Sequence, residues 1–132
     1  MLVINDKRTK TSGYKILVVE NDPSLIDILE EVFEEEGYRY TIFNDVLDIL
    51  PLVEEYQQDL VLLDFVLPRI NGGELCSQLK SVAGTQDIPV IIYSAAPKAF
   101  LSLGDYGCDL FIPKPFDLDE LIQCINLLLP AN

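Results

Sequence analysis

The fold is decided by the stretch Ile16-Leu-Val-Val-Glu-Asn-Asp-Pro23, in which four apolar residues in a row are followed at once by polar ones. An unbroken apolar run of this length is typical of a strand that is buried on both faces. Asp22 and Pro23 then supply the cap and the first-turn proline of a helix. That helix keeps its apolar residues on one stripe, and Gly37 predicts its end. A buried strand that leads directly into an amphipathic helix indicates an α/β protein.

The same alternation of strand and helix continues along the chain. Three further apolar runs predict strands over residues 60–63, 89–93 and 110–112, and the more polar stretch 38–43 predicts a strand at an edge of the sheet. Because these strands alternate with helices, the sequence predicts a parallel sheet covered by helices on both sides. Residues 1–13 show no periodicity, so we expect a flexible N-terminal leader there and a single domain over residues 14–132.

The helices that follow the later strands differ in how clearly the sequence marks them. Residues 45–58 look helical, but Pro51 inside the pattern should distort or delay the first turns. Asn71 and Asp117 each precede a glutamate by three positions, as in the capping boxes of two further helices. The helix over residues 97–106 is the weak one, because a glycine inside it costs about 1 kcal/mol relative to alanine.

Composition excludes several classes of function. The chain has 132 residues, with 22 acidic against nine basic ones, and its net charge of −13 repels nucleic acid and anionic membranes. We therefore expect no direct contact with nucleic acid and no membrane association. The absence of histidine excludes His-based nucleophiles and His-ligated zinc. Cys76, Cys108 and Cys124 are odd in number and far apart, which argues against disulfides and favours the reducing cytoplasm.

Polar residues follow four of the predicted strands. They are Glu20-Asn21-Asp22, Asp64, Ser94-Ala95 and Lys114-Pro115. In open α/β sheets the ligand site lies outside the carboxyl ends of the strands, so we expect these side chains to converge at one edge. Oxygen ligands of this kind suit Mg²⁺, and a lysine and a hydroxyl nearby would bind a phosphoryl group.

Four motifs in this order resemble the receiver (REC) domain of bacterial two-component response regulators. They are Ile16-Leu-Val-Val-Glu-Asn-Asp22, Asp64-x-x-x-Pro68-x-x-x-Gly72, Val90-Ile-Ile-Tyr-Ser-Ala95 and Phe111-Ile-Pro-Lys-Pro-Phe116. The match covers nearly all of residues 15–129, and we expect a stand-alone, single-domain regulator without an output domain. The resemblance implies a flavodoxin-like, doubly wound (βα)5 three-layer sandwich with five parallel strands in the order 2-1-3-4-5.

The resemblance also implies roles for residues that match the motifs. Asp64 would be the phosphoacceptor that takes a phosphoryl group from a sensor histidine kinase or a phosphotransfer protein. Ser94 and Lys114 would be the catalytic groups that bind the phosphoryl oxygens. Ser94 and Phe111 would form the switch that passes the phosphorylated state to a downstream protein target by conformational change. The Lys114–Pro115 peptide bond would be cis.

The same resemblance implies a Mg²⁺ site made of Glu20, Asn21, Asp64 and the backbone carbonyl of Val66. The family usually carries two adjacent acids after the first strand, the second of them a principal metal ligand, whereas this chain has an uncharged amide at Asn21. That departure bears on the affinity for Mg²⁺ and on the rate of phosphorylation. Asp22 does not repair it, since we expect this residue to cap the helix.

Two other readings of the same residues stay open. A pseudo-receiver would use this fold as a protein-interaction module that works without phosphorylation, and Asn21 favours that reading. An aspartyl-phosphate phosphatase of the haloacid dehalogenase type would need a second acid where this chain has Val66. We therefore expect no enzyme beyond weak self-dephosphorylation. The last helix has a wide apolar arc that includes Cys124 and Leu127, which suggests a partner surface and a possible homodimer.

Overall fold

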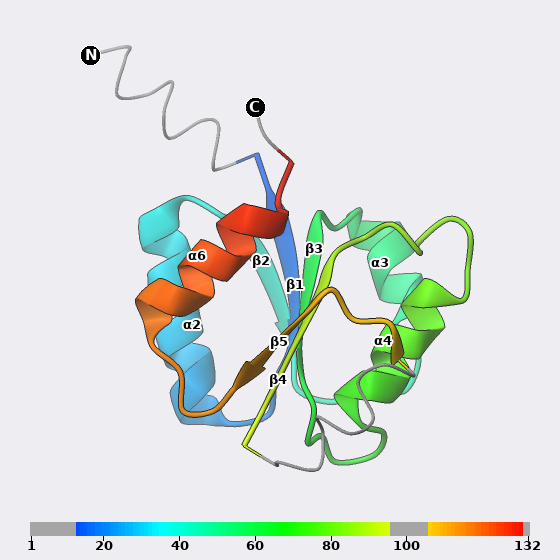
Figure 1. The fold of residues 1–132 in the computed structure, drawn as a ribbon, viewed down its shortest axis with the longest axis horizontal. Helices are drawn as coiled ribbons and strands as arrows, with labels where there is room; N and C mark the ends of the chain where they lie inside the picture. The colour runs from blue at the N-terminus through cyan, green and yellow to red at the C-terminus, as the bar shows by residue number, and fades with distance from the viewer. Residues whose placement is uncertain (1–12, 96–105, 131–132) are drawn as a thin grey trace.

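The structure is a computed structural model that describes residues 13–95 and 106–130 (Figure 1). In chain order the elements are β1 (Lys15–Val19), α2 (Pro23–Glu36), β2 (Arg39–Phe43), α3 (Leu50–Tyr56), β3 (Leu60–Asp64), α4 (Gly72–Lys80), β4 (Val90–Ser94), β5 (Leu110–Pro113) and α6 (Leu118–Leu128). The predicted leader, and all but the last residue of the weak helix predicted over residues 97–106, lie outside the described residues.

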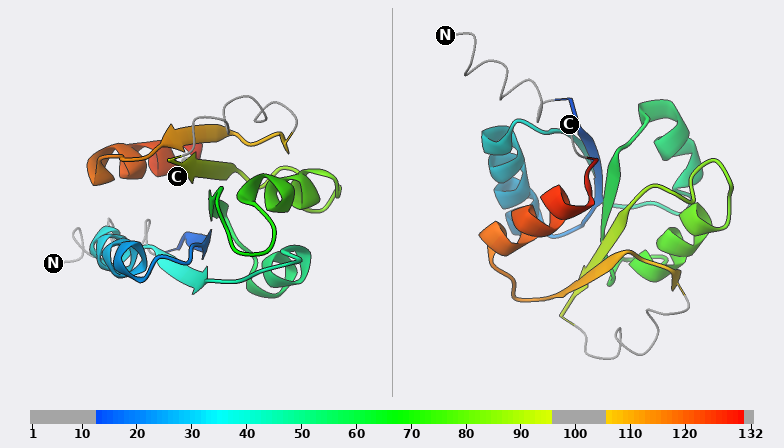
Figure 2. Two further views of the ribbon diagram at one scale, coloured as in Figure 1. Left: turned by 90° about the horizontal axis from the view of Figure 1, so that it is seen from below. Right: turned by 45° about the horizontal axis from the view of Figure 1, so that its top comes forward.

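The five strands form one parallel sheet in the order β2-β1-β3-β4-β5, which confirms the predicted fold. Helices α2 and α6 cover one face of this sheet, and α3 and α4 cover the other (Figures 1 and 2). All carboxyl ends of the strands therefore point to the same edge, because the strands are parallel. None of the helices within the described residues is long and apolar enough to cross a bilayer.

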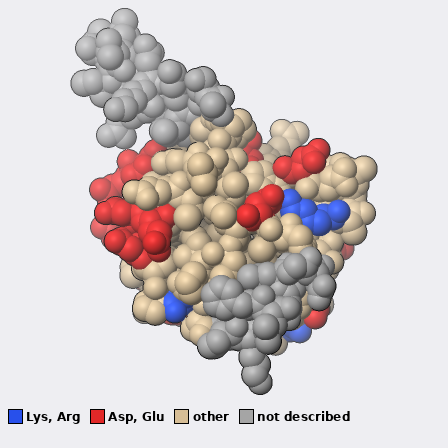
Figure 3. Space-filling view, viewed as in Figure 1, with Lys and Arg blue, Asp and Glu red and all other residues tan. Residues whose placement is uncertain are grey.

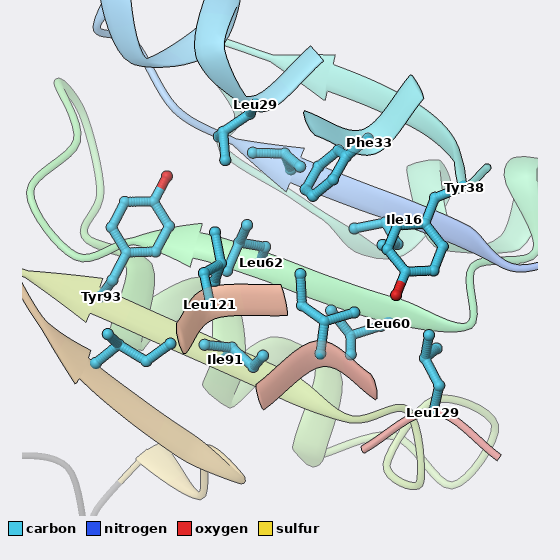
Figure 4. Packing of buried hydrophobic residues seen from close by; sticks show 13 residues of the cluster. Ile16, Leu29, Phe33, Tyr38, Leu60, Leu62, Ile91, Tyr93, Leu121 and Leu129 are labelled. Atoms are coloured by element: carbon cyan, nitrogen blue, oxygen red, sulfur yellow. The ribbon is translucent and has the colours of Figure 1, made fainter. Parts of the chain in front are cut away.

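Alternate residues of each central strand build two separate cores. Along β1, Ile16 and Val18 face α2 and α6, whereas Leu17 and Val19 face α3 and α4, and all four are fully buried. Figure 4 shows the first of these clusters, where Phe33 and its neighbours cover the strands. Each aliphatic side chain buried in this way contributes about 1.5–3 kcal/mol, so the strands are fixed from both faces.

The ends of the first helix are set by the residues that predicted them. The Asp22 side chain accepts a hydrogen bond of 3.0 Å from the Ser24 N–H, and Pro23 occupies the first turn of α2. Gly37 ends the helix with φ of 80°, a left-handed conformation that glycine adopts at little cost. Acidic side chains of α2 gather on the surface at the left of Figure 3, and no lysine or arginine of this helix balances them.

The second helix is shorter than predicted. The periodicity predicts residues 45–58, but α3 begins at Leu50, with Pro51 in its first turn, and ends at Tyr56, followed by Gln57 in a left-handed conformation. The expected delay of the first turns is confirmed, and the predicted start at residue 45 is wrong. Proline lacks a backbone N–H and fits only the first turn, where no intrahelical partner for that group exists.

The cysteines carry no disulfide within the described residues. Cys76 is fully buried, and burial raises the pKa of its thiol to about 12. Burial also raises the pKa of Cys108, which is half-buried. Both thiols are therefore poor nucleophiles at neutral pH, as expected of small apolar core residues.

Candidate functional site

The predicted site residues meet at the carboxyl edge of the sheet. Asp64 ends β3 and pairs in register with Tyr93 of β4, and Glu20 follows β1 directly. Lys114 follows β5, and its ammonium nitrogen Nζ lies 3.4 Å from Asp64 Oδ2 and 3.8 Å from Glu20 Oε1. One cation therefore faces two carboxylates. The Ser94 side chain at the end of β4 is also buried. The backbone N–H of Lys114 donates a hydrogen bond of 2.8 Å to the backbone carbonyl of Ser94.

The two carboxylates are almost closed off from solvent. Glu20 is 0% exposed and Asp64 is 5% exposed. Burial, and next the charge of Glu20, raise the pKa of Asp64 to about 6, and Lys114 and the Val66 N–H offset only part of that shift. The site therefore holds more negative charge than its own cation balances, which is the electrostatic signature of a functional site that attracts a further cation.

Glu20 is held by three hydrogen-bond donors. Its Oε2 accepts from the backbone N–H groups of Asn21 at 3.1 Å and Asp22 at 2.9 Å. Its Oε1 accepts from the hydroxyl of Tyr93 at 2.5 Å. Burial and the charge of Glu20 raise the pKa of Tyr93 well above its ordinary value, so this phenol stays protonated and donates. Asn21 itself is exposed.

The loop after β3 is fixed by an unusually close approach of two backbones. The Val66 N–H donates to Asp64 Oδ1 at 3.1 Å, which orients the carboxylate. The Gly72 N–H donates to the Phe65 carbonyl at 2.9 Å, and a Cβ at position 72 would lie only 2.3 Å from the Asp64 carbonyl oxygen. Only glycine permits this approach, so Gly72 brings the start of α4 against the residue that carries the site.

Other predicted residues lie around this centre. The Lys114–Pro115 peptide bond is cis, as the motif implied. The Asp22 side chain caps α2, as expected. Phe111 is half-buried against the cluster beneath α3 and α4.

A groove of about 430 Å³ opens beside Lys114, between the first turns of α2 and the start of α6, and Leu25 and Ile28 line it.

A family model for the response regulator receiver domain matches residues 16–126. The chain belongs to this family. A receiver domain also explains why the four polar strand ends lie together at one edge of a five-stranded sheet, which is the fold that the motifs implied.

Curated relatives of this receiver domain are response regulators and a transcriptional regulator. The chain is 38% identical over 117 residues to the response regulator ArlR of Staphylococcus saprophyticus, which covers 87% of the chain and 52% of ArlR. It is 36% identical over 122 residues to the probable transcriptional regulator ycf29 of Pyropia yezoensis, which covers 91% of the chain and 55% of that protein. The chain therefore spans about half the length of these relatives.

Solved receiver domains share its fold. The response regulator TrrA of Thermotoga maritima, in complex with Mg²⁺ and BeF, has a TM-score of 0.78 and 28% identity, covering 88% of this chain and 99% of that one. The receiver domain of the Francisella response regulator 1452 has a TM-score of 0.76 and 30% identity, covering 87% and 95%.

The oxygens of this receiver domain fit Mg²⁺ better than a transition metal. The described residues contain no group of three His, Cys, Asp or Glu side chains that could hold a metal ion. Mg²⁺ is commonly bound by one or two carboxylates, with waters and phosphate oxygens completing its shell. Glu20 and Asp64 would provide the carboxylates, and the uncharged oxygens would come from Asn21 and the Val66 carbonyl, which adjoin them in the sequence. The uncompensated negative charge around Asp64 favours the same ion.

Tyr93 is the residue of this receiver domain that sequence reasoning missed. The sequence places it in a buried strand and within one of the four motifs, without a role of its own, yet its hydroxyl contacts Glu20, and Lys114 Nζ lies 4.9 Å from its ring centroid. The available signal was a phenol one residue before Ser94, because a buried tyrosine needs an acceptor for its O–H. Gly72 was part of a motif, but the steric reason for it comes from the structure.

Proposed function

We propose that this receiver domain accepts a phosphoryl group on Asp64 from a histidine kinase or phosphotransfer protein, in a reaction that needs Mg²⁺, and signals by conformational change. The observation that carries the proposal is the buried Asp64 carboxylate, with a pKa raised to about 6 and Lys114 3.4 Å away. A purely structural role would not explain why two buried carboxylates and one lysine lie together, because burial of unbalanced charge destabilises the fold.

Transfer would form a bond from an Asp64 carboxylate oxygen to phosphorus, while the bond from phosphorus to the imidazole nitrogen of the partner's histidine breaks. Two unit charges 4 Å apart repel by about 1 kcal/mol in water and about 4 kcal/mol in a partly screened site. Lys114 offsets part of this repulsion. Bound Mg²⁺ supplies further positive charge and polarises the phosphoryl group. The oxygens that would hold it belong to Glu20, Asn21, Asp64 and the Val66 carbonyl.

The conformational output would start from groups that touch both the phosphoryl group and the edge of the sheet. Ser94 would bond a phosphoryl oxygen, and its carbonyl already accepts from the N–H of Lys114, which follows β5. Phe111 lies in the same strand, so a shift of β5 would change its packing. The added charge at Asp64 would in this way shift the equilibrium between two conformations of the surface around β5.

Partners follow from charge and exposure. With a net charge of −13, the domain itself would bind proteins and not nucleic acid. Leu127 on α6 is 76% exposed, which supports a homodimer or a target-binding surface on that helix. We therefore propose a histidine kinase, a downstream target protein and a second copy of the domain as partners. Self-dephosphorylation would be the only enzymatic activity of the domain.

A pseudo-receiver is the second candidate. Asn21 removes one charged ligand, and the Glu20 carboxylate is already bonded to three protein donors. Both observations favour a domain that binds a partner without phosphorylation.

Mass spectrometry of the intact protein separates the two candidates. The chain is incubated with Mg²⁺ and acetyl phosphate beside Asp64→Asn. A single phosphate adduct on the parent that the variant lacks is the expected result. The absence of an adduct, repeated with the phosphorylated form of a histidine kinase as donor, would contradict the proposal and favour the pseudo-receiver.

A further inference from the structure

The contacts of Tyr93 go beyond those needed for a core residue. Its ring is fully buried at one end of the cluster beneath α2 and α6 (Figure 4). The ring is in edge contact with Phe116, at 5.5 Å between centroids. Its hydroxyl donates to Glu20 Oε1, and Lys114 Nζ lies 4.9 Å from its ring centroid. Tyr93 therefore touches one of the carboxylates and the lysine of the site.

The Glu20 carboxylate has little capacity left for a metal ion. An ionised carboxylate offers about four acceptor positions on its two oxygens. Three of these are taken by the N–H groups of Asn21 and Asp22 and by the Tyr93 hydroxyl, and Lys114 Nζ stands 3.8 Å from Oε1. One position therefore remains, on Oε1, and a metal ion or a water bound to it would share this oxygen with the Tyr93 hydroxyl or displace that hydroxyl.

Tyr93 is the donor that can be displaced most easily. The N–H groups of Asn21 and Asp22 belong to the backbone between β1 and α2, where Asp22 also caps the helix. Moving them would disturb the start of α2. The Tyr93 hydroxyl, in contrast, is the end of a side chain, and its O–H can rotate away from Glu20 about the Cζ–O bond without moving the backbone or the buried ring.

We infer that Tyr93 is a positioning residue that holds Glu20 in its metal-free arrangement, and that its hydroxyl competes with Mg²⁺ for Glu20 Oε1. The inference rests on the proposed function, because Glu20 is a metal ligand only there. On metal binding the Tyr93–Glu20 hydrogen bond then weakens or breaks, which couples occupancy of the metal site to the environment of the Tyr93 ring.

The test is calorimetric titration of the full chain with Mg²⁺, comparing the parent with Tyr93→Phe. Removing the hydroxyl should tighten Mg²⁺ binding by about tenfold or more, as expected from the loss of one competing hydrogen bond to a charged group. Tyr40→Phe is the matched control, because the Tyr40 hydroxyl donates to a carboxylate oxygen of Glu34 at 2.5 Å, outside the site. Unchanged or weaker binding by Tyr93→Phe would overturn the inference.

Asn21→Asp separates failure of the inference from failure of the proposed function. If that variant binds Mg²⁺ and accepts phosphate while Tyr93→Phe leaves the affinity unchanged in both backgrounds, only the inference is wrong. If the parent and all variants bind no Mg²⁺ and accept no phosphate, the proposed function fails and the inference fails with it.

A second measurement does not depend on a variant at Tyr93. The ring ¹³Cζ resonances of the six tyrosines are followed during a Mg²⁺ titration of the parent and of Asn21→Asp. The resonance of Tyr93, assigned through bonds, should shift more than any other as its hydroxyl leaves Glu20. A Tyr93 resonance that stays in place at metal saturation would overturn the inference even if Tyr93→Phe did not fold.

Discussion

Lys114 and Asp64 form a partly buried ion pair, with Nζ 3.4 Å from Oδ2. In most such pairs the lysine lowers the pKa of the acid, but here burial and the charge of Glu20 outweigh it, and the pKa of Asp64 is raised to about 6. The ion pair is thus one part of a site in which negative charge predominates.

The raised pKa predicts that the stability of the metal-free protein falls as pH rises. Between the ordinary value of 3.8 and the folded value of about 6, the folded state binds more protons at Asp64 than the unfolded chain does. The free energy of unfolding therefore decreases with pH across this window, by at most about 3 kcal/mol from this group.

Asp64→Asn isolates that contribution. Urea denaturation of parent and variant, at pH values that span both pKa values, should show the variant gaining in relative stability as pH rises and then levelling off above about pH 6. Parallel pH profiles for the two proteins would contradict the prediction.

Asn21→Asp should restore a charged ligand beside Glu20. We expect Mg²⁺ to bind at least about tenfold more tightly, since an added charge a few Å from the ion contributes on the order of 1 kcal/mol or more even when screened. Phosphorylation by acetyl phosphate should become faster, and the metal-free variant should be less stable than the parent. Gln86→Glu, an exposed position before β4, adds the same charge at the other end of the sheet and should change neither the affinity for Mg²⁺ nor the rate of phosphorylation.

Gly72→Ala should disturb the site through the backbone. The added Cβ would meet the Asp64 carbonyl oxygen at 2.3 Å, so the loop between β3 and α4 must shift. We expect a loss of about 1–3 kcal/mol in the free energy of unfolding, with slower phosphorylation of Asp64. Gly84→Ala is the control, because a Cβ there meets nothing within 4 Å. Equal stability of the two variants would argue against the close approach.

Lys114→Met removes the cation and leaves the aliphatic part of the side chain. The pKa of Asp64 should rise above its value of about 6, because Lys114 lowers it in the parent. Titration of the Asp64 carboxyl ¹³C resonance measures this shift directly. Arg69→Met breaks an exposed ion pair with Asp45 and should leave that titration unchanged, since exposed pairs contribute little. A pKa that falls in Lys114→Met would contradict the assignment of charges.

The sheet could be predicted because its strands carry the information locally. The central strands are unbroken apolar runs with polar residues at their carboxyl ends, and parallel strands bring those ends to one edge. Glu20, Asp64 and Lys114 could therefore be placed together before any coordinates were known. The role of Tyr93 could not, because this residue lies within β4 and not after its carboxyl end, where polar site residues are expected.

The start of α3 could not be predicted for a related reason. Val46 and Ile49 have helical spacing and are buried, yet they belong to an irregular segment. Its backbone is satisfied by a distant side chain: Gln78 Nε2 donates to the Leu47 carbonyl, and Gln78 Oε1 accepts from the Ile49 N–H, both at 2.9 Å. The periodicity of a short stretch of sequence cannot predict hydrogen bonds between residues that lie 29 or more positions apart.

The Gln78 side chain also has a mechanical consequence. By bonding two backbone groups of the segment before α3, it ties this segment to α4, which leads away from the loop of Asp64. We expect α3 and α4 to open together in native-state hydrogen exchange, as one cooperative unit. Helices α3 and α4, which cover one face of the sheet, then move as one rigid unit. A structural change at the carboxyl end of β3 would therefore be transmitted to both helices.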